Sequence, residues 1–457
     1  MAGIVAIYDF GENKNPEKVL SYLITGMRML QHRGKAYWKM MIGNKVIENK
    51  GAIPPDDVLA TTIKKQNLTG FCGLGYLSKR SPHFPSMNLI NISLDGFLVD
   101  TEKLHTHPYI ESAKSLDPLY QIYYIFMKLI NDRKNSELAA EFLDRHLRGN
   151  LVIKNRDELI VFRNSTAFKP LFMASNDKIV MISSENSLRI SYPNLKFLNI
   201  QPGQLIKLDR KSYINSLVSL EGRKILLDPF EFIRESHVTS MFGDKSIYSI
   251  RKNIGRVQAD YVPVEMDLNS IYAEPDYTRP MALGMGLKLQ KDLSDFEISE
   301  GIIKDRYDDS DHMIDFSEQE SKNKLLTTGK SLKFIIENLT KNKKIATIQG
   351  TIQTGSTVRE TVYYLKKNGV KRVYVIVCYV PTIDGRQVGL YTQNRDLLAN
   401  KYIGKISNLE RLNFYVAPEI GSEKIFYNSP SILAKGIGIS ENKLWFPEWI
   451  RFLDYEK

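Results

Sequence analysis

The sequence predicts two domains, an α+β domain in which a strand-rich layer lies between helices, followed by an α/β domain built on a parallel sheet. Three observations favour this arrangement. The chain has 457 residues, too many for one compact core. Up to about residue 220, many short strands accompany two helical stretches. From about residue 230, strand and helix alternate. We place the domains at 1–225 and 226–457.

The first domain begins with a strand. Gly3-Ile4-Val5-Ala6-Ile7 is a continuous apolar run, typical of a short buried strand. The segment PEKVLSYLITGMRMLQHRG has apolar residues at helical spacing and predicts a helix that stops at Gly34. A helical pair is expected over DPLYQIYYIFMKLINDRKNSELAAEFLDRHLRG, ending at Gly149.

Further strands follow in the same domain. They are the short apolar segments GNLVIKN, ELIVFRN, KIVMISSE and GQLIKLD, each bounded by turn residues. Residues 209–235 are charged and rich in turn residues. We expect this stretch to be the linker between the domains.

The second domain contains a strand–helix–strand repeat. KKIATIQG predicts an apolar strand, STVRETVYYLKKNG an amphipathic helix closed by Gly369, and VKRVYVIVCYV a second buried strand. Such a βαβ unit predicts a parallel sheet with helices on both faces. Trp445, Phe446 and Trp449 lie close together in the tail, so we expect the tail to be packed.

The composition excludes several classes of protein. Two cysteines, Cys72 and Cys378, exclude a disulfide framework and any four-thiolate metal or iron–sulfur site within one chain. No segment reaches the roughly 18 consecutive apolar residues of a membrane helix. Asp9, Glu12 and Glu17 stand where a leader peptide would be basic and then apolar. We therefore expect a cytoplasmic protein without a membrane segment.

The net charge is +11, from 63 basic and 52 acidic residues that are interspersed along the chain. The one dense basic run, Lys341–Lys344, directly precedes an apolar strand. This pattern favours a solvated surface that keeps the protein in solution, and an anionic partner such as RNA stays open as an alternative.

Several segments resemble, in the same order, those of glutamine phosphoribosylpyrophosphate amidotransferase, the family that begins purine synthesis. They are MAGIVAI, against the family's M-C-G-I-V-G-I, then LQHRG, FRNSTAFKPL, SSENSL, IQPGQLIKLD, FEFIRESHVTSMFGDKSIYSIRKNIG, AEPDYTRPMALGMG and GIIKDRY. The resemblance implies an N-terminal nucleophile glutaminase domain, an αββα sandwich, followed by a type I phosphoribosyltransferase domain with a C-terminal helical tail.

Residue 2 is where this family places its catalytic nucleophile. The family has cysteine there, whose thiol attacks the amide and whose free amine acts as the base. Ala2 has no thiol, and a methyl group cannot form an acyl intermediate. An engineered cysteine-to-alanine change would explain Ala2 but none of the differences that follow.

The rest of the glutamine pocket also departs from the family pattern. GLGYLSKRS puts Ser78 and Lys79 at the family's arginine and tyrosine positions, with Arg80 on the same strand face as Ser78 and about 7 Å further along. The family's oxyanion-stabilising N-G-N resembles Asp95-Gly96-Phe97, which places a negative charge where hydrogen-bond donors are needed. We expect this pocket to have become part of the core.

The transferase signature is altered in the same way. In the family an apolar strand is followed by D-D-S-x-x-R-G-T-T, whose carboxylates bind on the ribose and magnesium side and whose turn holds the 5-phosphate. Here Gln349 and Gly350 stand at the acidic pair. The turn survives as Thr354, Gly355, Ser356 and Thr357. It predicts either a phosphate-binding turn or a helix cap made by the hydroxyls.

Two loops around this site agree with that interpretation. The family's diphosphate loop P-D-S-G-R-P reads PDYTRP, so Tyr277 and Thr278 replace small residues between the remaining ligand-binding candidates Asp276 and Arg279. The family's flexible loop N-R-Y-V-G-R-T reads DRYDDSD over 305–311, and its aspartates would repel an anionic ligand. We expect no magnesium and no other cofactor.

Other candidate residues are interpreted as structural. His105 and His107 have an H-x-H spacing but no acidic or thiol residue nearby in sequence, so we expect no metal site there. His32 and Arg33 stand at the end of a helix. Cys72 stands in an apolar strand and is expected to be a small core residue.

These observations predict a non-catalytic member of the family, a pseudoenzyme. It would serve as a scaffold, as a regulatory subunit of an active relative, or as a nucleotide sensor through the 354–357 turn. We expect a homo-oligomer, or a hetero-oligomer with an active relative, because family members associate. Two alternatives are an altered phosphoribosyltransferase that uses ammonia and a basic RNA- or ribosome-associated protein.

Overall fold

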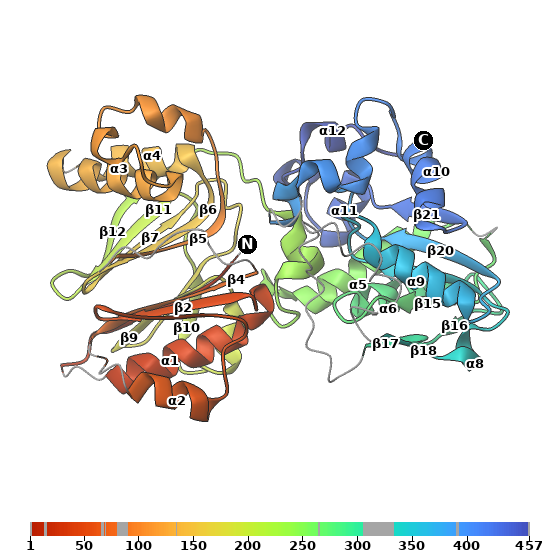
Figure 1. The fold of residues 1–457 in the computed structure, drawn as a ribbon, viewed down its shortest axis with the longest axis horizontal. Coiled ribbons are helices and arrows are strands. Elements are labelled where there is room, and N and C mark those ends of the chain that lie inside the picture. Colours follow the sequence, from red (N-terminus) through yellow and green to blue (C-terminus); the bar gives the residue numbers. More distant parts are fainter. Residues whose placement is uncertain are drawn as a thin grey trace. The chain divides into compact units, whose positions relative to one another are not determined.

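The computed structural model describes residues 2–12, 16–64, 68, 70–79, 90–133, 135–263, 266–304, 333–389 and 393–455. These residues form two units (Figure 1). Unit 1 consists of Met1–Pro229, Glu235–Met241 and Asn442–Trp445. Unit 2 consists of Phe230–Arg234, Phe242–Glu441 and Phe446–Lys457.

Unit 1 contains two antiparallel sheets. The first has the order β10-β8-β9-β1-β4-β2-β3 and the second β12-β11-β7-β6-β5. The strands of the first are β1 (Ala2–Asp9), β2 (Tyr37–Ile42), β3 (Lys45–Lys50), β4 (Cys72–Ser78), β8 (Phe172–Ser175), β9 (Ile179–Ser183) and β10 (Lys196–Asn199). Those of the second are β5 (Ile90–Leu98), β6 (Leu147–Asn155), β7 (Glu158–Arg163), β11 (Gln204–Asp209) and β12 (Tyr213–Ser219).

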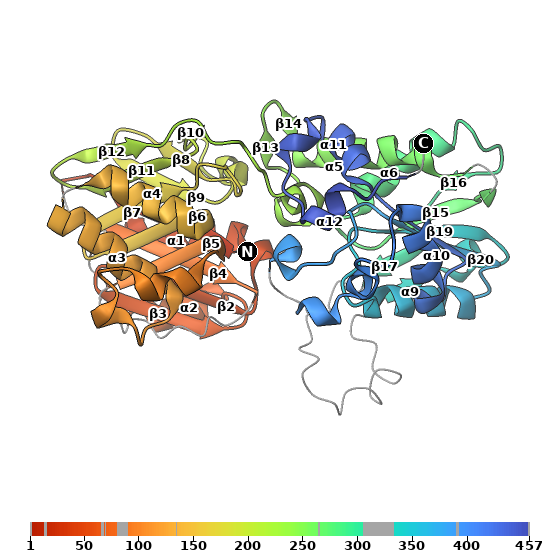
Figure 2. The same ribbon diagram turned by 90° about the horizontal axis from the view of Figure 1, so that it is seen from above.

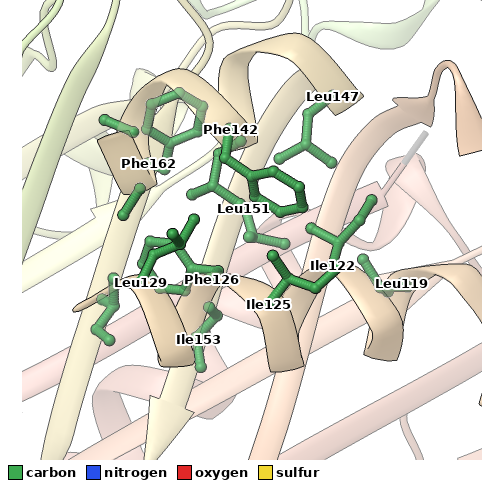
Figure 3. Packing of buried hydrophobic residues seen from close by; sticks show 14 of the residues in the cluster. Leu119, Ile122, Ile125, Phe126, Leu129, Phe142, Leu147, Leu151, Ile153 and Phe162 are labelled. Atoms are coloured by element: carbon green, nitrogen blue, oxygen red, sulfur yellow. The ribbon is translucent and has the colours of Figure 1, made fainter. Parts of the chain in front are cut away.

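Helices cover the outer face of each sheet of unit 1, so the layers run helix, sheet, sheet, helix (Figure 1). Apolar side chains of α1 (Pro16–Met29) and α2 (Asp56–Lys64) pack on the first sheet. Those of α3 (Pro118–Arg133) and α4 (Ser136–His146) pack on the second sheet, as Figure 3 shows. A third apolar cluster lies between the two sheets. The expected αββα sandwich is therefore confirmed.

β1 is buried along its whole length because it lies in the middle of the first sheet. Val5 and Ile7 join the cluster beneath α1, whereas Ile4, Ala6 and Tyr8 join the cluster between the sheets. Burial on both faces explains why the segment is a continuous apolar run rather than an alternating one.

The predicted helical pair ends earlier than expected. α4 stops at His146, and Gly149 lies within β6, directly opposite Gly96 of β5. Both glycines have positive φ, and a Cβ on Gly96 would lie 2.0 Å from the carbonyl oxygen of Arg148. Gly149 therefore permits a close approach of two strands and does not end a helix.

The first predicted helix also differs in its last turn. The α-helix ends at Met29, and Gln31–Arg33 forms a 3₁₀ turn before Gly34. A Cβ on Gly34 would lie 2.4 Å from the carbonyl carbon of Ser78, so only glycine fits beside β4. This turn directs the Arg33 side chain into the interior of unit 1.

The predicted linker over 209–235 is wrong for its first part, because residues 213–219 form β12. This strand pairs with β11, and the Asp209 carboxylate closes the turn by accepting the N–H groups of Lys211 and Ser212 at 2.8 Å. β12 is mostly exposed, and its apolar residues Ile214, Leu217 and Val218 do not alternate with polar ones, so the segment lacks the period of a strand.

Unit 2 contains a five-stranded parallel sheet of order β16-β15-β19-β20-β21. Its strands are β15 (Ser270–Ala273), β16 (Glu297–Ile298), β19 (Lys344–Gln349), β20 (Arg372–Val377) and β21 (Lys424–Tyr427). The short strands elsewhere are β13 (Met241–Phe242), β14 (Lys245–Ser246), β17 (Ile302–Lys304) and β18 (Lys333–Ile335). The helices are α5 (Ile247–Gln258), α6 (Arg279–Leu289), α8 (Glu337–Thr340), α9 (Ser356–Lys367), α10 (Leu409–Ile420), α11 (Pro430–Ile437) and α12 (Glu448–Arg451).

The predicted βαβ unit is confirmed as β19–α9–β20. The chain continues in the same direction through α10 to β21, so right-handed crossovers place α9 and α10 on one face of the sheet, where they contact each other (Figure 2). The step from β15 through α6 to β16 runs the opposite way and places α6 on the other face, where it packs on α5.

The tail is packed, as expected. The ring of Trp445 lies 5.9 Å from that of Phe97 and 5.6 Å from that of Phe168 within unit 1. Phe446 is buried in unit 2.

Helices α5 and α6 cross at glycines. A Cβ on Gly255 would lie 1.9 Å from the carbonyl oxygen of Met281, and one on Gly284 would lie 1.8 Å from that of Lys252. The two helix backbones are therefore in direct contact.

We expect Gly284→Ala to lower the free energy of unfolding by roughly 1 to 3 kcal/mol, because the added methyl must separate α5 from α6. Gly286→Ala in the same helix is the control, since its Cβ would first meet the Ile298 side chain at 3.2 Å. Urea unfolding followed by circular dichroism measures both. Equal stability of the two variants would contradict the close crossing.

Candidate functional site

Ala2, at the position of the family's nucleophile, is fully buried at the start of β1. Its backbone N–H donates to Oδ1 of Asp95 at 2.8 Å, and its carbonyl oxygen accepts from Nε of Arg33 at 2.8 Å. The structure thus brings together Ala2 and Asp95, which the sequence analysis had singled out, and adds Arg33.

Arg33 lies at the centre of a buried network of charges. Its Nη2 donates to Oδ2 of Asp95 at 2.9 Å, and its Nη1 donates to Oε1 of Glu185 at 3.0 Å. All three side chains are at most 1% exposed. A buried guanidinium is tolerated only when it is paired, so the two carboxylates are what allows Arg33 to be there.

Glu185 connects this network to His32 in the same 3₁₀ turn and to one further segment of unit 1, residues 235–241. Its Oε1 lies 2.7 Å from Nε2 of His32, and its Oε2 accepts from the backbone N–H of His237 at 2.9 Å and from the Ser240 hydroxyl at 2.7 Å. Burial by itself raises the pKa of the Glu185 carboxyl, but His32, Arg33 and Ser240 outweigh it and hold that pKa at about 2.

The other residues of the former pocket are also engaged. Ser78 pairs with Ala2 across β1 and β4. Nζ of Lys79 forms an ion pair with the buried Oε1 of Glu235 at 2.6 Å. Arg80 lies outside the described residues. At the position where the family's arginine grips a carboxylate, this chain therefore has a small hydroxyl.

The groups beside residue 2 differ from those that the family uses for amide hydrolysis. The methyl of Ala2 cannot attack a carbonyl carbon. The Asp95 carboxylate accepts hydrogen bonds from Ala2 and Arg33, so an oxyanion beside residue 2 would meet an acceptor instead of donors.

The acidic-pair position in unit 2 is occupied by a donor that faces inward. Gln349 ends β19 and is buried, and its Nε2 donates to Oε2 of Glu274 at 3.3 Å and to Oγ1 of Thr347 at 3.1 Å. The Thr361 hydroxyl donates to the same Glu274 oxygen at 3.1 Å. These contacts bind Gln349 to the interior of the unit.

The neighbouring Gly350 is covered by the ring of Tyr277. A Cβ on Gly350 would lie 2.1 Å from Cε2 of that ring, and the guanidinium of Arg234 lies 5.1 Å from the ring centroid. Burial raises the pKa of Tyr277. The ring therefore fills the space next to the former acidic pair.

The turn at 354–357 lies at the start of α9. Gly355 has φ of +83° and precedes the first residue of α9 without making a side-chain cap. The Thr354 hydroxyl lies 3.1 Å from that of Ser356 and accepts the Ser356 N–H at 3.4 Å. The Thr354 hydroxyl therefore satisfies one N–H group at the start of α9, although the N-cap residue Gly355 has no side chain to do so, and Thr357 stands in the first turn of α9.

Arg359 adds a positive charge to this turn. Its Nη2 lies 3.2 Å from where a Cβ on Gly355 would be, and its Nε donates to the Glu419 carbonyl oxygen at 2.8 Å. The backbone bond fixes the guanidinium beside the turn.

Asp276 and Arg279 pair with each other at 3.6 Å, and Arg279 also pairs with Glu300 at 3.2 Å. The acidic loop 305–311 lies outside the described residues. In the described part of the chain, no group of three His, Cys, Asp or Glu side chains could hold a metal ion. Gln349 and Gly350 offer no carboxylate, so the residues at this position do not suit magnesium.

The remaining candidates lie away from both positions. Nδ1 of His107 accepts the Tyr109 N–H at 3.2 Å, and His105 stands in the same 3₁₀ segment. Cys72 is fully buried between the sheets, where burial raises the pKa of its thiol to about 11. Its expected place in the core is confirmed.

Known proteins resemble this chain over nearly its full length. No protein-family model matches it. The amidophosphoribosyltransferase of Methanocaldococcus jannaschii is 24% identical over 470 aligned positions, covering 96% of this chain and 94% of the relative. That of Synechococcus elongatus is 23% identical and covers 87% of this chain and 81% of its own length.

Solved structures share the fold. The glutamine phosphoribosylpyrophosphate amidotransferase of Bacillus subtilis, complexed with ADP and GMP, has a TM-score of 0.72 at 19% identity and covers 95% of this chain and 92% of its own. A structure described as the allosteric regulatory enzyme of purine biosynthesis has a TM-score of 0.73 at 18% identity and covers 97% and 94%. The chain is a relative of the amidophosphoribosyltransferases.

Three residues at these two sites could not be picked out from the sequence: Arg33 and Glu185 near Ala2, and Arg359 beside the 354–357 turn. Arg33 was interpreted only as a helix-end residue, and Glu185 was noted only as part of the SSENSL resemblance. Both residues are charged and lie in segments that resemble the family, but nothing in either segment shows that the two are paired. Nothing in the sequence showed that Arg359 lies against Gly355.

No helix among the described residues of this amidophosphoribosyltransferase relative is long and apolar enough to span a membrane.

The Glu185 carboxylate should make stability depend on pH. Its pKa in the folded chain, about 2, is below the ordinary value of 4.5. The contribution is therefore present above about pH 4.5 and is lost as the pH falls toward 2, and it amounts to roughly 3 kcal/mol. Urea unfolding from pH 7 to 3 should show a steeper fall for the wild type than for Glu185→Gln.

The exposed Glu221→Gln is the control for this measurement and should follow the wild type. Parallel pH profiles for the wild type and Glu185→Gln would contradict the assignment of the low pKa.

A double-mutant cycle tests whether the Tyr277 ring fills the space beside Gly350. Gly350→Ala should destabilise the chain by roughly 1 to 3 kcal/mol, because the new methyl meets the Tyr277 ring. In a Tyr277→Ala background the same change should be nearly neutral, which gives a coupling energy of about 1 kcal/mol or more. Additive effects in chemical denaturation would show that the ring does not occupy this space.

Proposed function

We propose that this chain is a non-catalytic relative of the amidophosphoribosyltransferases that retains an organic-phosphate site at the 354–357 turn. The observation that carries the proposal is that buried side-chain interactions occupy both positions where the family has its reacting groups. The Arg33–Asp95 pair surrounds Ala2, and Gln349 and Tyr277 occupy the second position.

In the glutaminase-like unit, both the missing thiol at residue 2 and the charge of the neighbouring Asp95 support this proposal. Restoring a thiol at residue 2 would leave the Asp95 carboxylate 2.8 Å from the backbone nitrogen of that residue. Removing the Asp95 charge would in turn leave the buried Arg33 with one carboxylate partner fewer. One substitution therefore does not recreate a reactive site.

The transferase half supports a binding role without chemistry. The turn offers backbone N–H groups at the start of a twelve-residue helix, the hydroxyls of Thr354 and Ser356, and the Arg359 guanidinium. The related Bacillus subtilis enzyme is complexed with ADP and GMP. We extend a nucleotide ligand to this chain on that basis, with a 5′-phosphate held at the turn.

The biological role that fits these features is that of a nucleotide-responsive subunit or scaffold in the cytoplasm. We propose association with further copies of the chain or with an active relative. The family resemblance supports this association.

The test of the proposal is an activity assay with the full chain. Wild type and Ala2→Cys should release no glutamate from glutamine, and no diphosphate from phosphoribosyl pyrophosphate with magnesium and ammonia. The Methanocaldococcus jannaschii amidophosphoribosyltransferase serves as the positive control. Turnover by the wild type would overturn the proposal and favour the ammonia-dependent transferase.

Calorimetric titration tests the ligand. AMP or GMP should bind equally well with magnesium and with EDTA, because no carboxylate pair is present to hold the ion. Arg359→Gln should weaken binding by about tenfold, as loss of one charge-assisted hydrogen bond predicts. The exposed Arg372→Gln is the matched control. Absence of heat with both nucleotides would remove the sensor role.

A further inference from the structure

Four aromatic side chains on α9 and α10 are open to solvent. The exposed fractions are 57% for Tyr363, 37% for Tyr364, 73% for Phe414 and 51% for Tyr415. We call these four residues the aromatic patch. Single exposed apolar residues are normal, but a group of large rings on two adjacent helices indicates a binding surface.

Contacts between other residues join the two helices that carry these rings. Nε of Arg359 in α9 donates to the Glu419 carbonyl oxygen in α10 at 2.8 Å, and Nζ of Lys366 pairs with Glu423, just after α10, at 3.3 Å. Tyr363 is four residues after Arg359 and three before Lys366, so it lies on the same side of α9, toward α10.

On α10, the rings of Phe414 and Tyr415 are 5.5 Å apart and nearly perpendicular. The ring of Tyr402 stacks on Tyr415 with centroids 5.8 Å apart. Tyr415 lies one turn before Glu419, the residue that Arg359 contacts. The rings on α10 therefore continue to Tyr402 in the segment before α10, and α10 is joined to α9 beside Tyr415.

Basic side chains surround the rings. α9, α10 and residues 398–408 together contain six cations and three carboxylates. The exposed cations are Lys366, Lys367, Lys401, Lys405 and Arg411. Nζ of Lys401 pairs with Glu419 at 2.6 Å, and the Tyr402 hydroxyl donates to the same carboxylate. The surface thus combines exposed aromatic faces with an excess of positive charge.

We propose that the aromatic patch binds single-stranded nucleic acid, with unpaired bases stacked on the exposed rings and phosphates beside the flanking lysines and Arg411. Every base has a flat π face, so rings bordered by cations suit a single strand of any sequence. A second copy of this chain would bring like charges together on the same surface. The net charge of +11 adds long-range attraction for a polyanion.

This inference does not depend on the proposed nucleotide site. That site lies at the amino end of α9, whereas Tyr363, Tyr364, Lys366 and Lys367 lie in its carboxyl half. Either site could be lost without the other.

Fluorescence anisotropy with the full chain tests the proposal. The probes are fluorescein-labelled oligouridylate and oligothymidylate of about 15 nucleotides, a length that spans one typical single-strand site, and an RNA duplex of equal length. We expect both single strands to bind more tightly than the duplex. The logarithm of affinity should fall with the logarithm of salt concentration by about 0.7 for each phosphate contacted.

The decisive variant is Phe414→Ala, which should weaken single-strand binding by at least about fivefold through loss of one stacked base. Phe452→Ala is the matched control, because Phe452 is 76% exposed in unit 2 but lies outside the patch. Its affinity should equal that of the wild type. Tyr363→Ala and Tyr415→Ala should each weaken binding, whereas Tyr248→Ala, at a residue 42% exposed on α5, should not.

Three outcomes would overturn the proposal. These are no measurable binding of either single strand at low salt, equal affinity for the duplex, and equal losses for Phe414→Ala and Phe452→Ala. Light scattering is measured on the same variants. If Phe414→Ala dissociates an oligomer and leaves oligonucleotide affinity unchanged, the patch is an interface between copies of this chain.

Discussion

The buried guanidinium of Arg33 constrains the residues around Ala2, the position where the family has its glutaminase nucleophile. It holds the carbonyl oxygen of Ala2 and two carboxylates, and each of these partners comes from a different part of unit 1. Because the Arg33 side chain is fully buried, its charge is stabilised by pairing with both Asp95 and Glu185. These two ion pairs in turn hold the 3₁₀ turn that contains Arg33 in place. Charge balance with Arg33 accounts for the buried Asp95 beside residue 2.

At Gln349 and Gly350, the position of the acidic pair in unit 2, buried contacts also occupy the position, but they are made by neutral groups. The resemblance implies two acids here that bind on the ribose and magnesium side. Instead, Gln349 is hydrogen-bonded toward the interior, and the ring of Tyr277 lies on the adjacent Gly350. Hydrogen bonding and packing replace ligand contacts there. The turn that leads into α9 places partly exposed hydroxyls beside a fixed cation, Arg359, and the proposed binding role rests on this turn.

Local pattern was sufficient for much of the fold. The β19–α9–β20 unit follows from apolar runs and a helical period, and β1 from its continuous apolar segment. β12 was missed because an exposed edge strand has no apolar pattern, and α4 was extended because Gly149 was interpreted as a helix stop. The Arg33 network could not be derived, since its partners are 62 and 152 residues away. The packing of Tyr277 on Gly350 could not be predicted either, because the two residues are far apart in the sequence and meet only in the folded unit.

The division of the chain into units has a consequence for how the protein is made. Residues 235–241 and 442–445 belong to unit 1, and His237, Ser240 and Trp445 make contacts there with Glu185 and Phe97. The amino-terminal sandwich is therefore incomplete until residue 445 has been translated, which is after nearly all of unit 2. Its folding cannot finish first, as it does for independent domains that emerge in order, and a nascent chain must keep this half open or chaperoned meanwhile.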